Sequence, residues 1–187
     1  MNIEDKLKSL EKSEKKKKWE DVSNTAVEIA EYYFDQKMDY PQSLKFLERA
    51  VIARQKQKKA EAVIVLYRKI ITVARKGRRK TKKDLFRYAA AAIPLIEEYI
   101  RVLQESNRYF TKHGAMTRYF LGECREIVSG IQQRNKEFLQ AGRVFVEVGK
   151  NLSSSRKTEK EAEEAFEKSR AIFELMKTYR EEIFESL

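Results

Sequence analysis

The chain has 187 residues, a length that fits one compact domain or one short array of repeats. Apolar residues make up 42% of it, enough to bury a core, and charged residues make up 37%, well above the usual share of about a quarter. Only 6 Gly and 2 Pro are present, too few for the frequent turns of an all-β protein, so the composition favours long helices.

Cysteine usage and hydropathy point to the compartment. The single cysteine, Cys124, excludes an internal disulfide and a cysteine-based metal site within one chain, which fits a reducing environment. The first residues lack the apolar stretch of a signal peptide, and the longest stretch of low charge, 88–96, is too short to span a membrane. We therefore expect a cytoplasmic protein without a transmembrane segment.

The first expected element is a basic helix within residues 1–18, whose end should fray. A second helix is clearer, because its apolar residues follow the spacing of one helical face. Those residues are Val22, Ala26, Ile29, Ala30 and Tyr33. Pro41 should open the third helix, since the N–H that proline lacks would be unpaired in a first turn anyway.

The third and fourth helices should meet near residues 55–59. Their apolar faces are Leu44, Leu47 and Val51 in the third and Val63, Tyr67, Ile70, Ile71 and Ala74 in the fourth. No Gly or Pro marks the break, so one bent helix over 42–76 stays open as an alternative. Gly77 should end the fourth helix in the left-handed conformation.

A central helix is expected over residues 83–105, because this segment is apolar on two sides. The two faces are Leu85, Tyr88, Ala89, Ala92, Ile96, Tyr99 and Leu103 on one side and Phe86, Ile93 and Ile100 on the other. Pro94 should kink the helix, since it removes a backbone hydrogen bond. A connection is expected over 106–114.

Further helices are expected over residues 116–131, over 138–152 and from Thr158 onward. Thr158 and Glu161 have the spacing of a capping box at the start of the last helix. The apolar face of this helix is Ala162, Ala165, Phe166, Ile172, Phe173, Met176, Tyr179 and Ile183. About eight helices with mostly short connections predict antiparallel hairpins, and hence a single all-α helical-repeat domain over residues 1–187.

Two stretches carry a more specific pattern of small and large residues. In the first, a large residue precedes an Asp-Tyr turn, and small, large and small residues then recur at spacings of four and three. The residues are Phe34, Asp39, Tyr40, Ser43, Leu47 and Ala50 in the first stretch and Gly142, Phe145, Gly149, Ala162, Phe166 and Ser169 in the second. This pattern resembles the tetratricopeptide repeat, which implies a right-handed array of helix pairs. Val27 and Glu31 stand where that family usually has Trp and Gly, and the middle of the chain matches loosely.

Long and irregular hairpins of this kind are also similar in style to those of the soluble NSF attachment proteins. That resemblance implies a curved helical sheet whose basic residues bind acidic membrane-fusion helix bundles. It rests on the style of the repeats and on the distribution of charge in this chain.

The net charge of +11 is concentrated in one window. Between Arg54 and Lys83 there are 13 Lys and Arg and a single acid, Glu61, which gives this window +12 and the remainder of the chain −1. The densest part is the segment 75–83, which we expect to be a basic loop. A solvated loop is one interpretation, and a docking surface for an anionic partner is the other.

The residue types needed for catalysis are scarce. His113 is the only histidine, and its position beside Gly114 in an expected connection favours the surface over a catalytic role. Cys124 lies on an apolar face, which favours a buried thiol. No glycine loop for phosphate and no metal-ligand spacing is recognisable, so we expect no enzyme, no metal and no cofactor. Trp19 should take part in helix capping or cation–π packing.

The leading functional hypothesis is therefore a protein–protein interaction scaffold or adaptor that docks an acidic protein segment or helix bundle on a basic surface. The expected contact residues are Arg54, Lys58, Lys59, Arg75, Lys76, Arg78, Arg79, Lys80, Lys82 and Lys83, with Tyr32 and Tyr109 as candidates for lining a peptide groove. Binding of nucleic acid to residues 54–83 through its phosphates is one alternative, an anionic membrane surface is another, and a structural oligomer subunit is a third.

Overall fold

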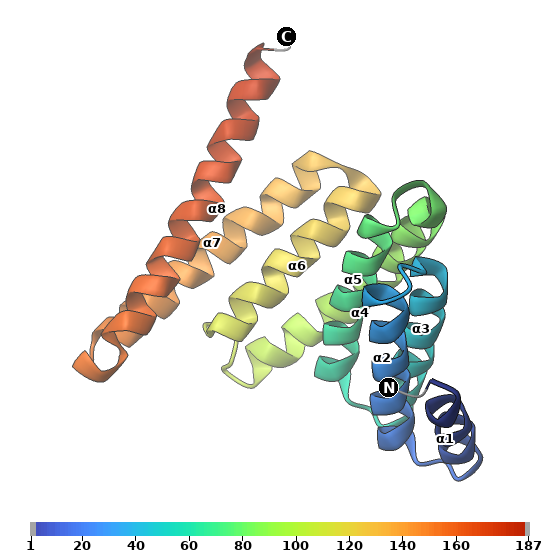
Figure 1. Cartoon of the computed structure of the whole chain (residues 1–187). Helices are drawn as coiled ribbons and strands as arrows, with labels where there is room; N and C mark the ends of the chain where they lie inside the picture. The colour runs from blue at the N-terminus through green and yellow to red at the C-terminus, as the bar shows by residue number, and fades with distance from the viewer. Residues whose placement is uncertain (1–2, 186–187) are drawn as a thin grey trace. The chain divides into compact units, whose positions relative to one another are not determined.

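The computed structural model describes residues 3–185 of the chain, and the side chains of residues 3–177. Within this range the secondary structure is helical, with no strand (Figure 1). The α-helices are α1 (Ile3–Lys15), α2 (Trp19–Asp35), α3 (Tyr40–Lys56), α4 (Ala60–Lys76), α5 (Lys82–Glu105), α6 (Lys112–Ser129), α7 (Ile131–Ser153) and α8 (Glu159–Glu185). Two short 3₁₀ helices, η1 (Arg78–Thr81) and η2 (Arg156–Thr158), precede α5 and α8. The all-α prediction is confirmed.

Most connections between helices turn on one residue with a positive φ. These residues are Lys17, Met38, Lys58, Arg78, Asn107 and Gly130, with φ between 49° and 86°. Five of the six are not glycine, although a left-handed conformation costs other residues about 1 kcal/mol. The break between α3 and α4 therefore exists as predicted, with Lys58 as the turning residue, and the single bent helix over 42–76 is excluded.

The chain divides into two compact units, Met1–Leu95 and Ile96–Leu187. In the first unit, α2 packs on α3, α3 packs on α4, and α1 packs on α2. Their shared core is formed by fully buried aliphatic side chains, among them Leu10, Val22, Ile29, Leu47, Ile70 and Ile71. This packing follows from the apolar stripes at helical spacing, which can leave water only by facing one another.

The pair α2 and α3 has the packing that the tetratricopeptide-like pattern predicts. Ser43, Leu47 and Ala50 on α3 are all buried, and their small–large–small order lets the two helix backbones approach. The Phe34 ring meets the Tyr40 ring edge to face, with 5.9 Å between centroids. At the start of α3 the Asp39 side chain accepts a hydrogen bond from the Gln42 N–H, and Pro41 lies in the first turn.

In the second unit, α6 packs on α7 and α7 packs on α8. The pattern of small residues predicted for the second repeat is again used for close approach. A Cβ at Gly149 would lie 2.6 Å from the Phe166 ring, so only glycine fits there. The Ser169 hydroxyl donates to the Gly142 carbonyl at 3.0 Å and so joins α8 to α7. The tetratricopeptide-like helix pairs are thus confirmed in both units, whereas Tyr179 and Ile183 lie outside the described side chains.

The helix α5 agrees with the expected span and continues through Pro94, and the boundary between the two units falls within it, after Leu95. Its second apolar face is only partly buried, contrary to the prediction. Phe86 is 52% exposed, whereas Ile100 is buried. None of the helices in the described range has the length and apolar character that a membrane crossing requires.

Two local predictions are wrong in detail. Gly77 ends α4 with φ −69°, and the left-handed residue is its neighbour Arg78. The expected connection over 106–114 ends at Thr111, whose side chain caps α6, so that His113 is a half-buried helical residue. At the start of α8 the Thr158 hydroxyl donates back to the Leu152 carbonyl, and the predicted capping box with Glu161 stays a prediction.

Candidate partner-binding surface

The basic window divides into residues that the fold itself uses and residues that it leaves at the surface. Arg54 is only 15% exposed at its side chain and donates to Glu20, Asn24 and Gln57. Lys59 also reaches Glu20, at 3.4 Å. Hydrogen bonds from Arg54 and then from Lys59 lower the pKa of the Glu20 carboxyl. Arg54 therefore joins α2 to the end of α3, Lys59 joins α2 to the start of α4, and both are poor candidates for partner contacts.

The segment Arg75–Lys83, which we call the basic corner, is not the loop that the sequence predicts. It comprises the end of α4, the 3₁₀ helix η1 and the first residues of α5. Thr81 is fully buried, and its hydroxyl donates to the Ala74 carbonyl at 2.6 Å. Glycine is required at position 77, because a Cβ there would collide with the Thr81 side chain. These two small residues fix the turn and hold its charged side chains outward.

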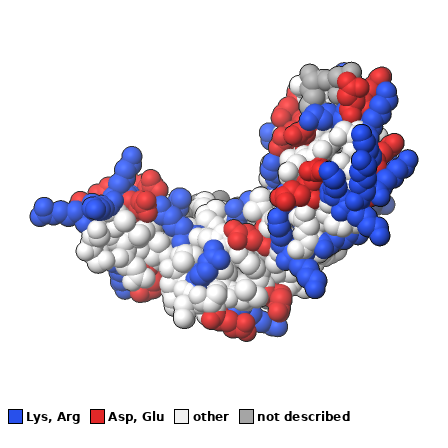
Figure 2. Space-filling model, turned by 90° about the horizontal axis from the view of Figure 1, so that it is seen from below, with Lys and Arg blue, Asp and Glu red and all other residues white. Residues whose placement is uncertain are grey.

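Five cations of the basic corner are exposed and form no ion pair within the described part of the chain. They are Arg78, Arg79, Lys80, Lys82 and Lys83, which we call the corner cations. Arg75 and Lys76 are exposed beside them, and the Lys76 ammonium lies 4.9 Å from the centre of the Phe34 ring. On the face shown in Figure 2, Lys and Arg are for the most part interspersed with Asp and Glu. The positive charge of the five corner cations is therefore not neutralised by an acid within the described part of the chain.

The candidate residues from the sequence do not form one surface. Lys58 and Lys59 lie at the start of α4, and the basic corner lies at its end. A helix of 17 residues is about 25 Å long, so these two groups are separated by the length of α4. The structure brings together only the members from Arg75 to Lys83.

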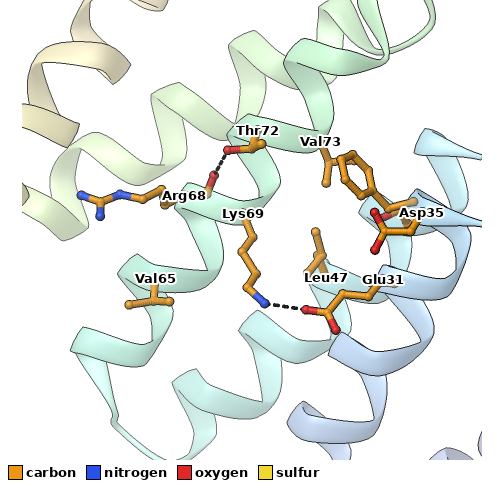
Figure 3. A pocket seen from close by; sticks show the side chains of 11 residues that line it. Glu31, Asp35, Leu47, Val65, Arg68, Lys69, Thr72 and Val73 are labelled. Carbon is orange, nitrogen blue, oxygen red and sulfur yellow. Dashed lines mark hydrogen bonds and ion pairs between the residues drawn. The ribbon is translucent and has the colours of Figure 1, made fainter. Parts of the chain in front are cut away.

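A groove that the sequence reasoning missed lies beside the basic corner, in the first unit. It encloses about 460 Å³ between α2 and α4, with α3 beneath (Figure 3). Its lining residues are Ala30, Glu31, Phe34, Asp35, Ser43, Leu47, Val65, Arg68, Lys69, Thr72 and Val73. We call it the α2–α4 groove. A sequence signal existed in Val65, an apolar residue of α4 that fits none of the predicted buried faces and is 50% exposed.

Six of the eleven residues that line the α2–α4 groove are polar or charged, namely Glu31, Asp35, Ser43, Arg68, Lys69 and Thr72. Lys69 of α4 donates to Glu31 of α2 at 2.7 Å, and Figure 3 shows this pair reaching from one wall to the other. The Arg68 side chain points away from the groove in the same view. At the floor, Ser43 is fully buried, and among the described side chains its Oγ is a buried polar atom without a hydrogen-bond partner.

The two candidate tyrosines do not share a site. Tyr32 is half-buried in the first unit, where its ring contacts Tyr33 and lies 5.7 Å from the Lys37 ammonium, and it does not line the α2–α4 groove. Tyr109 lines a hollow of about 360 Å³ in the second unit with Phe110 and residues of α7. Its hydroxyl accepts from Arg118 Nε at 3.1 Å. Tyr109 thus lines a hollow, whereas Tyr32 lies outside the α2–α4 groove.

The residues singled out for chemistry have structural surroundings. Cys124 is fully buried, as predicted. His113 Nε2 lies 3.1 Å from the Tyr99 hydroxyl, whereas a surface position was expected. Trp19 stacks with a cation as predicted, and the cation is Lys56 of α3, 3.8 Å from the ring centre. Across the described residues, no group of three His, Cys, Asp or Glu side chains could hold a metal ion.

Comparisons with known proteins leave the family open. No family model matches the sequence, and no curated protein matches it. A solved structure described as "Podosopora anserina putative kinesin light chain nearly identical TPR-like repeats" is similar over 91% of this chain and 94% of that chain, with 12% sequence identity and a TM-score of 0.33. The helix-pair packing described above therefore carries the fold assignment.

Proposed function

We propose that this protein is a non-enzymatic, cytoplasmic interaction scaffold that binds an acidic segment of a partner protein at the basic corner. The observation that carries the proposal is the set of five corner cations, which are exposed and form no ion pair with any described side chain, on a turn that Thr81 and Gly77 hold in place. A cationic surface that is already ordered loses little backbone entropy on binding, so more of its attraction is expressed as affinity.

The surroundings of the basic corner favour a polypeptide over a nucleic acid. Proteins that bind single strands add aromatic platforms for the bases to their basic grooves. The α2–α4 groove beside the corner instead has a single aromatic ring in its lining, Phe34, and the Lys76 ammonium lies over that ring. Tyr67, the one aromatic residue of the basic window, is buried, and burial raises the pKa of its hydroxyl.

The test is a binding titration of the whole chain with a fluorescently labelled pentaglutamate peptide. We expect binding that weakens steeply between about 50 and about 200 mM salt, because exposed charges are screened over shorter distances as salt rises. The variant carries Gln in place of all five corner cations. Its matched control carries Gln in place of five exposed lysines elsewhere, Lys8, Lys12, Lys15, Lys136 and Lys157.

Both variants lose five positive charges, so a difference between them reports position rather than net charge. Loss of peptide binding in the corner variant alone supports the proposal, and equal losses in both would refute it. The same titration with a 20-nucleotide RNA and a 20-base-pair DNA addresses the alternative. Tighter binding of either nucleic acid than of pentaglutamate, lost in the corner variant, would replace the acidic protein with nucleic acid as the partner.

A further inference from the structure

The α2–α4 groove and the basic corner adjoin on α4. Val73 lines the groove, and α4 ends at Lys76, three residues or about 5 Å further along the helix axis. Arg78, the first corner cation, follows after Gly77. Lys76 links the two features directly, because its ammonium lies over the Phe34 ring that forms part of the groove wall. A segment bound at the corner therefore passes the end of the groove.

The groove itself favours an uncharged apolar side chain. Its volume of about 460 Å³ lies in the range of pockets that bind ligands, and Leu47, Val65 and Val73 line it with aliphatic surface. Its charged lining residues are two acids, Glu31 and Asp35, and two cations, Arg68 and Lys69, so the lining as a whole carries no net charge to attract an ionic group. The face of its one aromatic ring is taken by Lys76, which favours an aliphatic occupant over an aromatic one that would stack.

Ser43 adds a polar requirement at the floor of the groove. Its hydroxyl is fully buried and unpartnered, in a position where alanine would give the same helix packing without the cost of an unsatisfied group. A bound segment that brings a backbone N–H or C=O to the floor would satisfy this hydroxyl. The apolar walls and the unpartnered Ser43 hydroxyl fit an apolar residue of a peptide, and the adjacent cations fit acidic residues. The expected ligand therefore has an apolar part and an acidic part.

We infer that the acidic partner segment carries one aliphatic anchor residue, two or three positions from its acidic run, which inserts into the α2–α4 groove while the acids meet the corner cations. The spacing follows from the rise of about 5 Å along α4 from Val73 to Lys76, beyond which the corner cations begin, and from a rise of about 3.3 Å per residue in an extended chain. This inference rests on the proposed function, since it assumes that the corner binds the acids.

The experiment compares three labelled peptides on the whole chain: Leu-Gly-Ser followed by five Glu, the same peptide with Ala in place of Leu, and a third with eight residues between Leu and the acids. We expect the first peptide to bind about tenfold more tightly than the Ala peptide, from burial of one leucine side chain. The third should lose most of this gain, because its anchor is out of register.

Two variants tie the gain to the groove. Val65→Trp fills the groove from a half-exposed position and should remove the advantage of Leu over Ala, whereas Val102→Trp, at an equally exposed position in the second unit, should retain it. Ser43→Ala should weaken the Leu peptide about threefold without lowering the melting temperature. Unchanged melting of Val65→Trp shows that the loss is not unfolding.

The outcomes separate the inference from the proposed function. Equal affinity of the Leu and Ala peptides for the unmodified chain, with both lost in the corner variant, overturns the anchor and leaves the acidic docking in place. No binding of any of the three peptides overturns both. If the Val65→Trp variant still binds the Leu peptide more tightly than the Ala peptide, the leucine binds outside the groove, and the inference is also overturned.

Discussion

The two units use charged residues in opposite ways. In the first unit, ion pairs such as Lys69 with Glu31 and Arg87 with Glu48 lie at the surface, and none of the described acids pairs with the corner cations. In the second unit, Glu137 of α7 is only 3% exposed. It accepts from two arginines of α6, Arg118 at 2.8 Å and Arg125 at 2.6 Å.

This difference shows that the net charge of a sequence segment does not reveal whether its charged residues stabilise the fold or can bind a partner. Arg125 also donates to Glu97 of α5 at 2.5 Å, so one network joins three helices of the second unit. Charges buried in this way need their partners, because an unpaired ion inside a protein is costly. The corner cations of the first unit remain hydrated and are available to a partner. The predictions below test this division between structural and available charge.

The largest effect is expected for Glu137→Ala. This change leaves Arg118 and Arg125 without their shared carboxylate in a largely buried place, and should lower the free energy of unfolding by about 3 kcal/mol. Urea unfolding followed by circular dichroism measures the loss. The matched control is Glu98→Ala, which removes a carboxylate from an exposed pair with Arg101 and should cost under about 0.5 kcal/mol. Equal losses of stability in the two variants would contradict the distinction between buried structural charges and exposed ones.

A smaller effect is expected for Arg49→Gln in the first unit. Arg49 holds α3 to α1 through two hydrogen bonds to Glu14, at 3.0 and 2.7 Å, from side chains about one third exposed. The loss should be about 1 kcal/mol and should shrink in high salt. Hydrogen exchange should accelerate in α1 and stay unchanged in α4. The control is Lys18→Gln, which removes an exposed ion pair with Asp21 at 3.9 Å and should change the free energy of unfolding little.

Smaller still is the effect expected for Lys69→Gln. The ion pair that this change removes spans the α2–α4 groove but is about half exposed on both sides, so stability should fall by under about 0.5 kcal/mol. Differential scanning calorimetry checks this, with the Arg87→Gln variant as a second exposed pair in the same unit. A fall of several degrees in melting temperature would place this pair among the structural charges of the fold.

Much of the fold was predictable because apolar periodicity determines which helix faces meet. The faces around Ile29, Leu47 and Ile70 are buried as their spacing predicts, and the small residues Ala50 and Gly149 mark close approaches between helices. The turn at Arg78 was not predictable by the same means. Its left-handed residue is an arginine beside a glycine, and the turn is held by a hydrogen bond from Thr81 to the Ala74 carbonyl, seven residues earlier in the chain.

The candidate site was predicted in part. The density of charge in 75–83 indicated where uncompensated cations would lie, because no acid falls within the segment. The roles of Arg54 and Lys59 could not be read from the sequence, since their acid, Glu20, lies more than thirty residues away on another helix. The α2–α4 groove could not be predicted from the sequence either, because a groove forms where the side chains of neighbouring helices leave space between them.

The smallest expected effect is that of replacing Arg54. This residue belongs to the basic window, but its hydrogen bonds place it among the charged residues that stabilise the fold. Its hydrogen bond to Glu20 is the main cause of the lowered pKa of that carboxyl, with Lys59 second. A carboxyl with a lowered pKa in the folded state stabilises the fold above its unfolded-state pKa, and this contribution is lost as pH falls through the folded-state pKa. Arg54→Gln should therefore raise the pKa of Glu20 toward its ordinary value.

Carbon-13 carboxyl titration by NMR measures this change directly. Glu164, whose pKa is lowered by a hydrogen bond from Lys112 in the second unit, is the internal control and should titrate as before. An unchanged pKa of Glu20 would mean that Arg54 is free of this acid in solution, and Arg54 would then join the corner cations among the available charges. A raised pKa of Glu20 with Glu164 unmoved keeps Arg54 within the fold and leaves partner binding to Arg75–Lys83.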